Sequence, residues 1–473
     1  SLKNKIIPPS LHYVNANAEI SFGKGPFYVN TEVKPWEEKG NRPLIAGVSS
    51  FGIGGTNAHT ILENFIPANT NNENRPESNI IAYSAKKPEA LKQYFTKLKK
   101  FITENQEINL SDLSYSLNTG RAQFDYRNTI VFRNREDLLN ELETKKNICQ
   151  KVKTSHQIVF VFPGQGAQYF KMGEQLYHQE EGFKQYIDQG LLILNNKFNT
   201  DYSQILGYDR IGTFDPAKIN ETQYTQPLLF LIEYALAKFL IELGIKPSLM
   251  IGHSLGEYVA ASISGVLSFE DGLVLVAERA LLMSKVPAGK MIAVNAPFNQ
   301  IKNEISDKVS VAAINSEQTT VLSGTEEDIL EFSTIFNEKN ITTTVLKTSH
   351  AFHSRMMDEI SADFENLFTD ITLSTPEIPY ISNLTAGIIL RDETKSPQYW
   401  KEQMLNTVLF EKGIQNILKD PNDYIFIELG PSTLANAIRQ NQFYKDNTII
   451  QVLRKSGENE EQQLLNRALG ELW

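Results

Sequence analysis

The sequence predicts an α/β protein built on a mostly parallel sheet, and three observations lead to this prediction. From residue 157 onward, strand-like apolar runs alternate with helical patterns. Within that region, "PSLMIGHSLGEYVAA" (247–261) has the pattern of a strand, a sharp turn and a helix. Residues 289–349 follow the order β-α-β-β-α-β, which is the ferredoxin-like arrangement. We therefore expect a large α/β unit with a smaller unit inserted in it.

Composition limits the class of protein. The chain has 473 residues, of which 41% are hydrophobic and 22% charged, as in a globular protein of two or three domains. A net charge of −10 without a basic tract argues against nucleic acid as a partner. No apolar run approaches the roughly 20 residues of a membrane span. Cys149 is the only cysteine, which excludes disulfides and cysteine-rich metal sites, and we expect no metal. A cytoplasmic location fits these features.

The N-terminal part divides into three stretches. Residues 1–65 close with "AGVSSFGIGGTNAHTILEN", whose glycine spacing is not that of a dinucleotide-binding fingerprint. A tight turn between short strands is favoured over a phosphate cradle. Residues 66–79 are rich in Asn, Pro and Glu and are predicted to be a loop or linker. Residues 80–144 contain two strand patterns and two helical patterns, which predict a small α/β unit. The chain begins without Met, and we expect it to be cut from a longer protein.

The turn after the apolar run carries Ser254 between two glycines. Gly252-His-Ser-Leu-Gly256 is the pattern of a nucleophile elbow, in which the glycines allow a strained turn that exposes the serine Oγ. The backbone N–H of Leu255 then points at the same place. A structural strand-turn-helix would produce the same pattern, and a serine alcohol needs a base before it can attack.

Two histidines in "SHAFHSRMMD" (349–358) are candidates for that base. His350 and His353 lie where the inserted unit returns to the large one, which is where a cleft is expected. A hydrogen-bonded structural histidine is the alternative, and we favour His353 as the base.

Two more residues belong to the predicted site. "FPGQGAQ" (162–168) follows the first strand of the large unit, so its turn is expected at the same sheet edge as Ser254. The backbone N–H of Gln165, together with that of Leu255, would form an oxyanion hole. Arg279 lies on the next helix, and its planar guanidinium suits a carboxylate. Taken alone, a surface arginine is the simpler interpretation.

Five motifs in this order resemble one known family: "FPGQGAQ", "GHSLGE", the arginine of "ERALLM", "HAFHS" and "ELGPSTL". Residues 157 to about 440 resemble the malonyl-type acyltransferase domain of polyketide and fatty-acid synthases. The resemblance implies an α/β-hydrolase-like large subdomain with the ferredoxin-like subdomain inserted in it, preceded by a small α/β linker domain. The flanks resemble neighbouring parts of a modular synthase. The implied division is a ketosynthase remnant (1–65), a ketosynthase–acyltransferase linker (66–156), the acyltransferase (157–288 and 350–445, with the small subdomain at 289–349) and a post-acyltransferase linker (446–473).

The resemblance also implies roles for individual residues. Ser254 would take the acyl group as an ester, and His353 would act as base on Ser254 and then on the incoming thiol. Gln165 and Leu255 would hold the oxyanion. Arg279 would pair with the free carboxylate of the extender unit.

Other residues would shape the pocket. Gln403, in "WKEQMLNTV", matches the residue that orients the histidine, while His253 and His350 would line the site. "HAFH" (350–353) resembles the malonyl-selective pattern, since methylmalonyl-selective domains carry Tyr-Ala-Ser-His there. Phe352 would then crowd an α-methyl group, and Leu255 agrees with the malonyl type.

The implied reaction is ping-pong transfer of malonyl from coenzyme A to Ser254 and then to the phosphopantetheine thiol of an acyl carrier protein, with no permanently bound cofactor. The partners would be the carrier protein and the ketosynthase of the parent synthase. Ketosynthase activity itself is not expected, because no cysteine precedes Cys149, and His12 and His59 lie outside the ketosynthase catalytic motifs.

Three alternatives remain. One is an α-substituted malonyl unit, such as hydroxy- or methoxymalonyl, delivered on a carrier protein. Another is a serine hydrolase or editing thioesterase, which has no use for Arg279. The last is a non-catalytic docking module, which does not need Ser254, His353 and Gln165 together.

Overall fold

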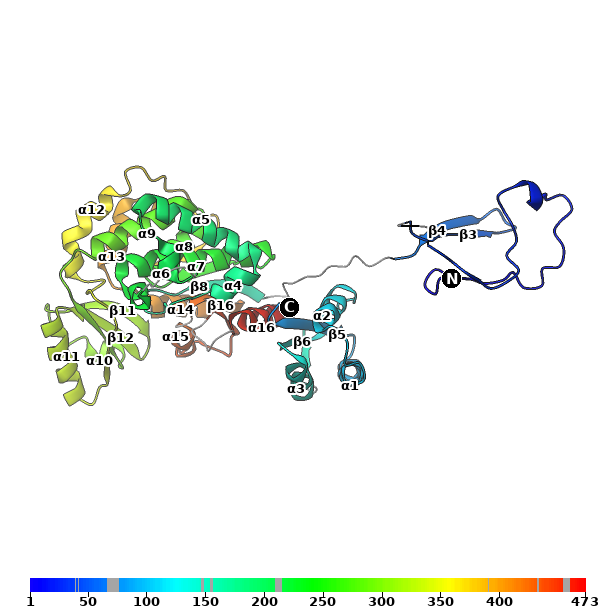
Figure 1. The fold of residues 1–473 in the computed structure, drawn as a ribbon. Helices are drawn as coiled ribbons and strands as arrows, with labels where there is room; N and C mark the ends of the chain where they lie inside the picture. The colour runs from blue at the N-terminus through cyan, green and yellow to red at the C-terminus, as the bar shows by residue number, and fades with distance from the viewer. Residues whose placement is uncertain are drawn as a thin grey trace. The chain divides into compact units, whose positions relative to one another are not determined.

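The structure is a computed structural model that describes residues 1–38, 40, 42–65, 76–145, 149–153, 156–208, 215–389, 391–431, 434–453 and 460–473. Its contacts divide the chain into two units, Ser1–Arg75 and Pro76–Trp473, both drawn in Figure 1. In the first unit, β3 (Ile45–Phe51) and β4 (Asn57–Glu63) form an antiparallel hairpin. The glycine-rich segment forms the turn of this hairpin, as the sequence predicts. The unit also contains β1 (Ile6–Ile7), β2 (Lys34–Pro35) and η1 (Phe22–Lys24).

The second unit begins with a small α/β part. Its antiparallel sheet has the order β5 (Asn79–Ala85), β6 (Tyr126–Phe132), β7 (Gln150–Lys151). The helices of this part are α1 (Pro88–Glu104), α2 (Leu110–Thr119) and α3 (Arg135–Lys145). The sequence patterns do not predict α2, because it buries only Leu113, Ser114 and Leu117. Its start is stabilised by the Asn109 side chain, which accepts from two backbone N–H groups.

A six-stranded sheet forms the centre of the second unit. Its order is β15 (Ile388–Ile389), β14 (Tyr380–Ile381), β9 (Leu249–Gly252), β8 (His156–Phe162), β16 (Asp423–Pro431), β17 (Ile449–Leu453). Every neighbouring pair is parallel except β14 and β15. The mostly parallel sheet is therefore confirmed, and the carboxyl ends of β14, β9 and β8 lie side by side. The edge strand β17 belongs to the segment predicted to follow the acyltransferase.

Helices cover this sheet, and Figure 1 shows α5, α7, α8 and α9 stacked together above β8 and β16. The helices of this region are η2 (Pro216–Asn220), α4 (Glu174–Gln179), α5 (Glu181–Phe198), α6 (Tyr202–Leu206), α7 (Thr222–Glu242), α8 (Gly256–Ile263) and α9 (Phe269–Met283). Those after the inserted unit are η3 (Arg355–Ile360), α12 (Ser361–Asn366), η4 (Asp392–Lys395), α13 (Pro397–Leu405), α14 (Phe410–Lys419) and α15 (Ala435–Arg439). Nearly all of α7 is buried, which explains why it is apolar on every side.

The inserted unit is a four-stranded antiparallel sheet with two helices. Its elements are β10 (Lys290–Val294), α10 (Phe298–Ile301), β11 (Ser310–Ser316), β12 (Thr319–Gly324), α11 (Glu326–Glu338) and β13 (Thr343–Val345). The strand order is β11-β12-β10-β13, so the first and third strands of the unit lie in the middle, as in ferredoxin-like domains. The predicted fold class is thus confirmed, although α10 is shorter than its helical pattern.

The C-terminal helix α16 (Glu461–Leu472) joins the small α/β part to the large one. The Glu461 carboxylate accepts from the backbone N–H groups of Gly173 (2.8 Å) and Gln175 (3.1 Å), at the start of α4. Further along the helix, Asn466 Nδ2 donates to the carbonyl oxygen of Ser78 at 3.2 Å. The helix therefore contacts both parts through specific hydrogen bonds.

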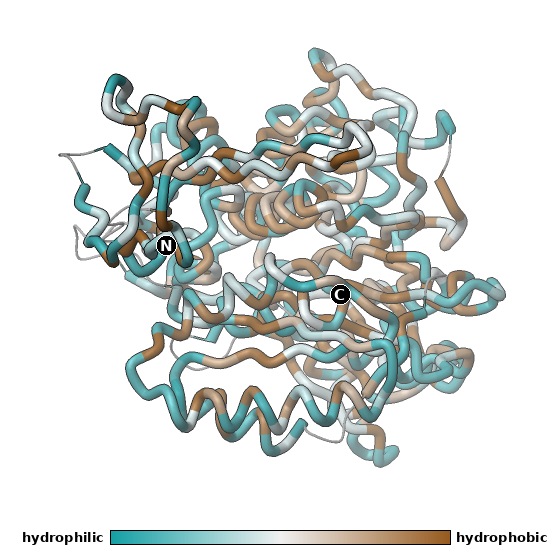
Figure 2. The backbone as a smooth tube through the Cα atoms, turned by 90° about the vertical axis from the view of Figure 1, so that its right-hand side faces the viewer, coloured by the Kyte–Doolittle hydropathy of each residue, from teal (hydrophilic) through white to brown (hydrophobic). Residues whose placement is uncertain are grey.

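Hydropathy follows this architecture. Figure 2 shows hydrophobic residues recurring along the helices and strands, while many of the turns are hydrophilic. Within the described ranges, none of the helices has the length and apolar character needed to cross a membrane. Nor do three or more His, Cys, Asp or Glu side chains of those ranges come together in a way that could hold a metal ion.

Candidate functional site

Ser254 lies in a strained turn directly after β9. Its φ is +52°, in the left-handed region that non-glycine residues rarely adopt. The flanking glycines leave no room for a side chain. A Cβ on Gly252 would lie 2.0 Å from the carbonyl carbon of Gly256, and one on Gly256 would lie 2.2 Å from the carbonyl oxygen of Phe162. The close passage of β8, the turn and α8 thus requires the glycine pattern of the elbow.

The structure brings His353 to Ser254. The Ser254 Oγ lies 2.6 Å from His353 Nε2, and His353 Nδ1 lies 3.0 Å from the carbonyl oxygen of Asn406. Because a carbonyl oxygen only accepts, the ring carries its proton on Nδ1. The lone pair of Nε2 then faces Oγ, so the serine hydroxyl donates. This tautomer is the one that can take the serine proton.

Burial keeps His353 neutral. The side chain is buried, and burial is the main cause that lowers its pKa from 6.5 to about 3. The positive charge of Arg279 and the neighbouring His253 lower it further, whereas the backbone carbonyls of Asn406 and Gln403 raise it. The imidazole is therefore ready to accept a proton at neutral pH.

Arg279, on α9, is a buried cation. It is 2% exposed, and its Nη1 donates to Gln226 Oε1 at 2.5 Å. Its guanidinium lies 5.3 Å from the centre of the Tyr258 ring, and its Nε has no hydrogen-bond partner. No Asp or Glu of the described ranges pairs with it. Since an unpaired buried charge is costly, Arg279 is suited to receive an anionic group.

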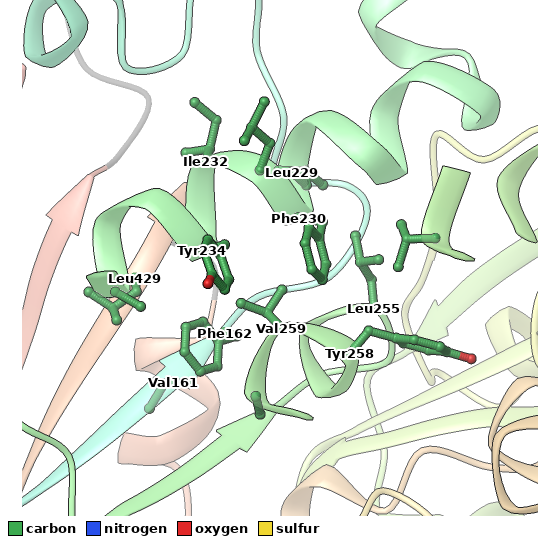
Figure 3. Packing of buried hydrophobic residues seen from close by; sticks show 14 of the residues in the cluster. Val161, Phe162, Leu229, Phe230, Ile232, Tyr234, Leu255, Tyr258, Val259 and Leu429 are labelled. Atoms are coloured by element: carbon green, nitrogen blue, oxygen red, sulfur yellow. The ribbon is translucent and has the colours of Figure 1, made fainter. Parts of the chain in front are cut away.

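Of the two predicted oxyanion residues, Leu255 directly follows Ser254 in the serine turn, and Gln165 lies in the turn after β8. A Cβ on Gly164 would lie 2.8 Å from the carbonyl oxygen of His253, so the turn after β8 passes against the elbow. Among the described residues, the backbone N–H groups of Gln165 and Leu255 have no hydrogen-bond acceptor. The Leu255 side chain is buried beside Phe230, as Figure 3 shows. Both N–H groups can therefore donate to another molecule.

Asn383 and Glu257 support the serine turn, and the sequence patterns do not single them out. Asn383 Oδ1 accepts from the Ser254 N–H, and its Nδ2 donates to the Gly252 carbonyl, both at 2.7 Å. Glu257 is fully buried and accepts from the N–H of Asn383, from Gln403 Nε2 and from the Tyr399 hydroxyl. Burial raises its pKa from 4.5 to about 7. One available signal is that Asn383 closely follows the apolar run "IPYI" (378–381), which ends with β14.

Gln403 contacts His353 through its backbone and not through its side chain. Instead, Nε2 donates to the carbonyl oxygen of Ser254 at 2.9 Å. The histidine is oriented by main-chain carbonyls at and just after the end of α13, those of Asn406 and Gln403. The physical reason is that the last carbonyls of a helix have no partner within the helix and are free to accept.

The remaining predicted residues lie around the serine turn or at the inserted unit. His253 Nε2 is 2.7 Å from Asn315 Oδ1 on β11, which joins the elbow to the inserted unit. His350 Nδ1 bonds to Ser349 Oγ at 2.8 Å, so only His353 of the two candidate bases reaches Ser254. Phe352 is 7% exposed, and its carbonyl accepts from Ser323 of β12 at 2.7 Å.

Together, the fold and this geometry define an α/β protein whose serine can form an acyl ester. The model of the "Acyl transferase domain" family matches residues 159–470, so the chain belongs to that family and is an acyltransferase. A second model, the "Ketoacyl-synthetase C-terminal extension", matches residues 17–131.

The relatives are polyketide synthases. The chain is 29% identical to "Polyketide synthase GfsB" of Streptomyces halstedii, over 93% of this chain and 8% of that protein. It is 32% identical to "Spectinabilin polyketide synthase system protein NorB" of Streptomyces orinoci, over 93% of this chain and 21% of that protein. The chain thus spans only a small part of the length of these relatives.

Two solved structures resemble the chain. The acyl transferase domain of ZmaA is 32% identical with a TM-score of 0.75, covering 85% of this chain and 94% of that one. The acyl transferase domain of SpnD, solved with 2-(pent-4-yn-1-yl)malonyl, is 25% identical with a TM-score of 0.76, covering 84% and 96%.

Proposed function

We propose that this chain transfers a malonyl-type acyl unit from coenzyme A to Ser254 and then to the phosphopantetheine thiol of an acyl carrier protein, in polyketide synthesis. The observation that carries the proposal is the 2.6 Å contact between Ser254 Oγ and His353 Nε2. The same site contains Arg279, which is buried and has no carboxylate partner among the residues that the structure describes. A reactive alcohol and a buried cation in the same site suit a thioester that bears a second carboxylate.

In the first half-reaction, Ser254 Oγ attacks the thioester carbonyl while its proton passes to His353 Nε2. The N–H groups of Gln165 and Leu255 are available to stabilise the oxyanion that forms. When the tetrahedral intermediate collapses, the C–S bond breaks and the coenzyme A sulfur leaves with the proton from His353. The products are acyl-Ser254 and free coenzyme A.

The second half-reaction runs the same chemistry in reverse. His353 takes the proton of the phosphopantetheine thiol, the thiolate attacks the ester carbonyl, and the Ser254 oxygen leaves with that proton. The family match and the polyketide synthase relatives support a carrier protein as the acceptor. No cofactor is consumed, because cleavage of the thioester supplies the free energy for forming the Ser254 ester.

Arg279 is the residue proposed to bind the free carboxylate of the substrate. A charge-assisted hydrogen bond contributes about 1.5–3 kcal/mol, which favours diacids by roughly tenfold to a hundredfold. Malonyl is the proposed extender, since the buried Phe352 beside His353 would crowd an α-substituent. The SpnD domain was solved with a substituted malonyl group, which keeps hydroxy- or methoxymalonyl on a carrier protein as the second candidate.

The remaining expectations also stay predictions. These are the division of the chain into ketosynthase remnant, linker, acyltransferase and post-acyltransferase linker, a ketosynthase partner, and a cytoplasmic location. The match of residues 17–131 to the ketoacyl-synthetase extension supports the ketosynthase partner. So do the exposed apolar side chains of the β3–β4 hairpin, such as Val48 and Ile61, which an isolated hairpin cannot bury.

Intact-mass spectrometry tests the proposal. The wild-type chain incubated with malonyl-CoA should gain one malonyl group, and a phosphopantetheinylated carrier protein should then remove it. Ser254→Ala should gain none. Ser248→Ala is the matched control, because Ser248 is an exposed serine at the opposite end of β9. Release of free malonate without loading of the carrier would identify a hydrolase instead. Failure of the wild type to load malonyl, although a fluorophosphonate labels Ser254, would refute malonyl transfer.

A further inference from the structure

Gln226 joins Arg279 to the turn that carries Gln165. It lies on α7 and is 3% exposed. Its Oε1 accepts from Arg279 Nη1 at 2.5 Å, and its Nε2 donates to Gln165 Oε1 at 3.1 Å. One buried amide thus touches both the cation and a residue of the predicted oxyanion hole.

The direction of these hydrogen bonds follows from chemistry. A guanidinium only donates, so it requires the oxygen of the Gln226 amide on its side. The NH₂ group of Gln226 must then face the oxygen of Gln165. The NH₂ group of Gln165 in turn faces Thr222 Oγ1, at 3.3 Å. The positive charge of Arg279 therefore sets the orientation of two consecutive amides.

The chain of contacts extends to the end of the inserted unit. Thr222 is 1% exposed, and its hydroxyl lies 3.3 Å from Ser349 Oγ, which bonds to His350. Three segments far apart in sequence are therefore joined through Gln226 and its neighbours. These are the turn after β8, the start of α7 and the segment that leaves the inserted unit.

We propose that Gln226 is a positioning and specificity-determining residue, which holds the Arg279 guanidinium for a substrate carboxylate and fixes the Gln165 turn beside Ser254. This inference rests on the proposed function and deepens it. Gln226 satisfies one N–H of the guanidinium with a neutral oxygen. It therefore restrains Arg279 without neutralising it, and the full positive charge remains for the substrate.

The chemistry predicts a specific result for Gln226→Glu. A glutamate at this position would give Arg279 a permanent internal carboxylate in place of the substrate's. It would also lose the donor to Gln165. Both thioesters should acylate Ser254 more slowly because the contact with Gln165 is lost. We expect the ratio of kcat/KM for malonyl-CoA to kcat/KM for acetyl-CoA to fall roughly tenfold to a hundredfold.

The experiment measures single-turnover acylation of Ser254 by the two thioesters. Labelling by a fluorophosphonate, which carries no carboxylate for Arg279, separately measures the reactivity of Ser254 with His353. Gln223→Glu is the matched control, because it makes the same change on the same helix, where the side chain bonds to Glu221. The control should keep the wild-type ratio. In the Arg279→Ala background, Gln226→Glu should cause no further loss of selectivity.

A ratio within twofold of wild type in Gln226→Glu would overturn the inference. If that variant does not fold, Gln226→Met decides, since a thioether of similar volume fills the space beside Met283 without either hydrogen bond. Its malonyl preference should fall while labelling is kept, and an unchanged preference would overturn the inference. The proposed function fails separately, if wild-type Ser254 is labelled by the fluorophosphonate but never loaded by malonyl-CoA.

Discussion

Asn383 holds Ser254 in its strained conformation. The side-chain oxygen of Asn383 accepts from the Ser254 N–H at 2.7 Å, while its NH₂ group donates to the carbonyl of Gly252 at the same distance. One amide therefore binds both sides of a turn whose φ at Ser254 is +52°. A backbone conformation of this kind costs roughly 1–3 kcal/mol and persists only when its surroundings enforce it.

Replacing Asn383 by Ala should release the turn. The Ser254 N–H and the Gly252 carbonyl lose their partner, and we expect the free energy of unfolding to fall by about 1–3 kcal/mol. Acylation of Ser254 should slow at least tenfold, since the hydroxyl is no longer held against His353. Denaturant titration and single-turnover mass spectrometry measure the two effects. Asn416→Ala, which removes one hydrogen bond to the Ala386 carbonyl, should slow acylation little. Equal acylation by the two variants would contradict this prediction.

The pH dependence of acylation should differ between substrates. The charge of Arg279 contributes to the lowered pKa of His353, and a malonyl carboxylate bound to Arg279 would cancel part of that charge. The neutral imidazole is the active form, so the rate falls as pH drops through the pKa of His353. In a profile of the acylation rate against pH, the fall on the acidic side (the acid limb) should therefore lie at higher pH for malonyl-CoA than for acetyl-CoA. In Arg279→Met the two limbs should coincide. An acetyl limb at the higher pH would exclude this coupling.

Arg279→Met should remove the preference for diacids. The substitution keeps an apolar side chain above the Tyr258 ring but removes the charge. We expect malonyl transfer to fall roughly tenfold to a hundredfold and acetyl transfer to be retained or to rise. Competition between the two thioesters, read by mass spectrometry, gives the ratio. Arg439→Met, on an exposed side chain of α15, is the control. Unchanged selectivity in Arg279→Met would remove Arg279 from the site.

Glu257→Gln should change how stability depends on pH. The folded protein holds the Glu257 proton more tightly, with a pKa of about 7 against 4.5. Between these values the unfolded chain gives up the proton first, so the free energy of unfolding falls as pH rises, by up to about 1.4 kcal/mol per pH unit. Glutamine does not titrate, so the variant should gain stability relative to wild type between pH 5 and pH 7. Denaturant titrations across this range test it, with Glu327→Gln on α11 as the exposed control. A constant difference would contradict the prediction.

Local patterns predicted the parts of the site that depend on local chain geometry. Gly252 and Gly256 lie within two residues of Ser254, so the strained turn can be expected from a few letters of sequence. The inserted unit could be predicted because each of its strands and helices has its own periodicity. His353 could be chosen because the chain returns to the large unit there.

The supporting residues could not be predicted in this way. Asn383 lies 129 residues from Ser254, and Gln226 lies 53 residues from Arg279. Each is a single polar residue beside or within an apolar run, and only the packed sheet and helices bring it to its partner. Gln403 shows the related difficulty that a motif can place a residue near a histidine without telling whether its side chain or its backbone makes the contact.

The two-sided attachment of α16 bears on the engineering of hybrid synthases. Glu461 is bound at the start of α4, and Asn466 is bound to the strand region of the small α/β part. If the segment transferred to another synthase stops after residue 445, it lacks both β17 and α16. Residues 76–473 should therefore be transferred as one piece, because this keeps the contacts of α16 with both α4 and the small α/β part.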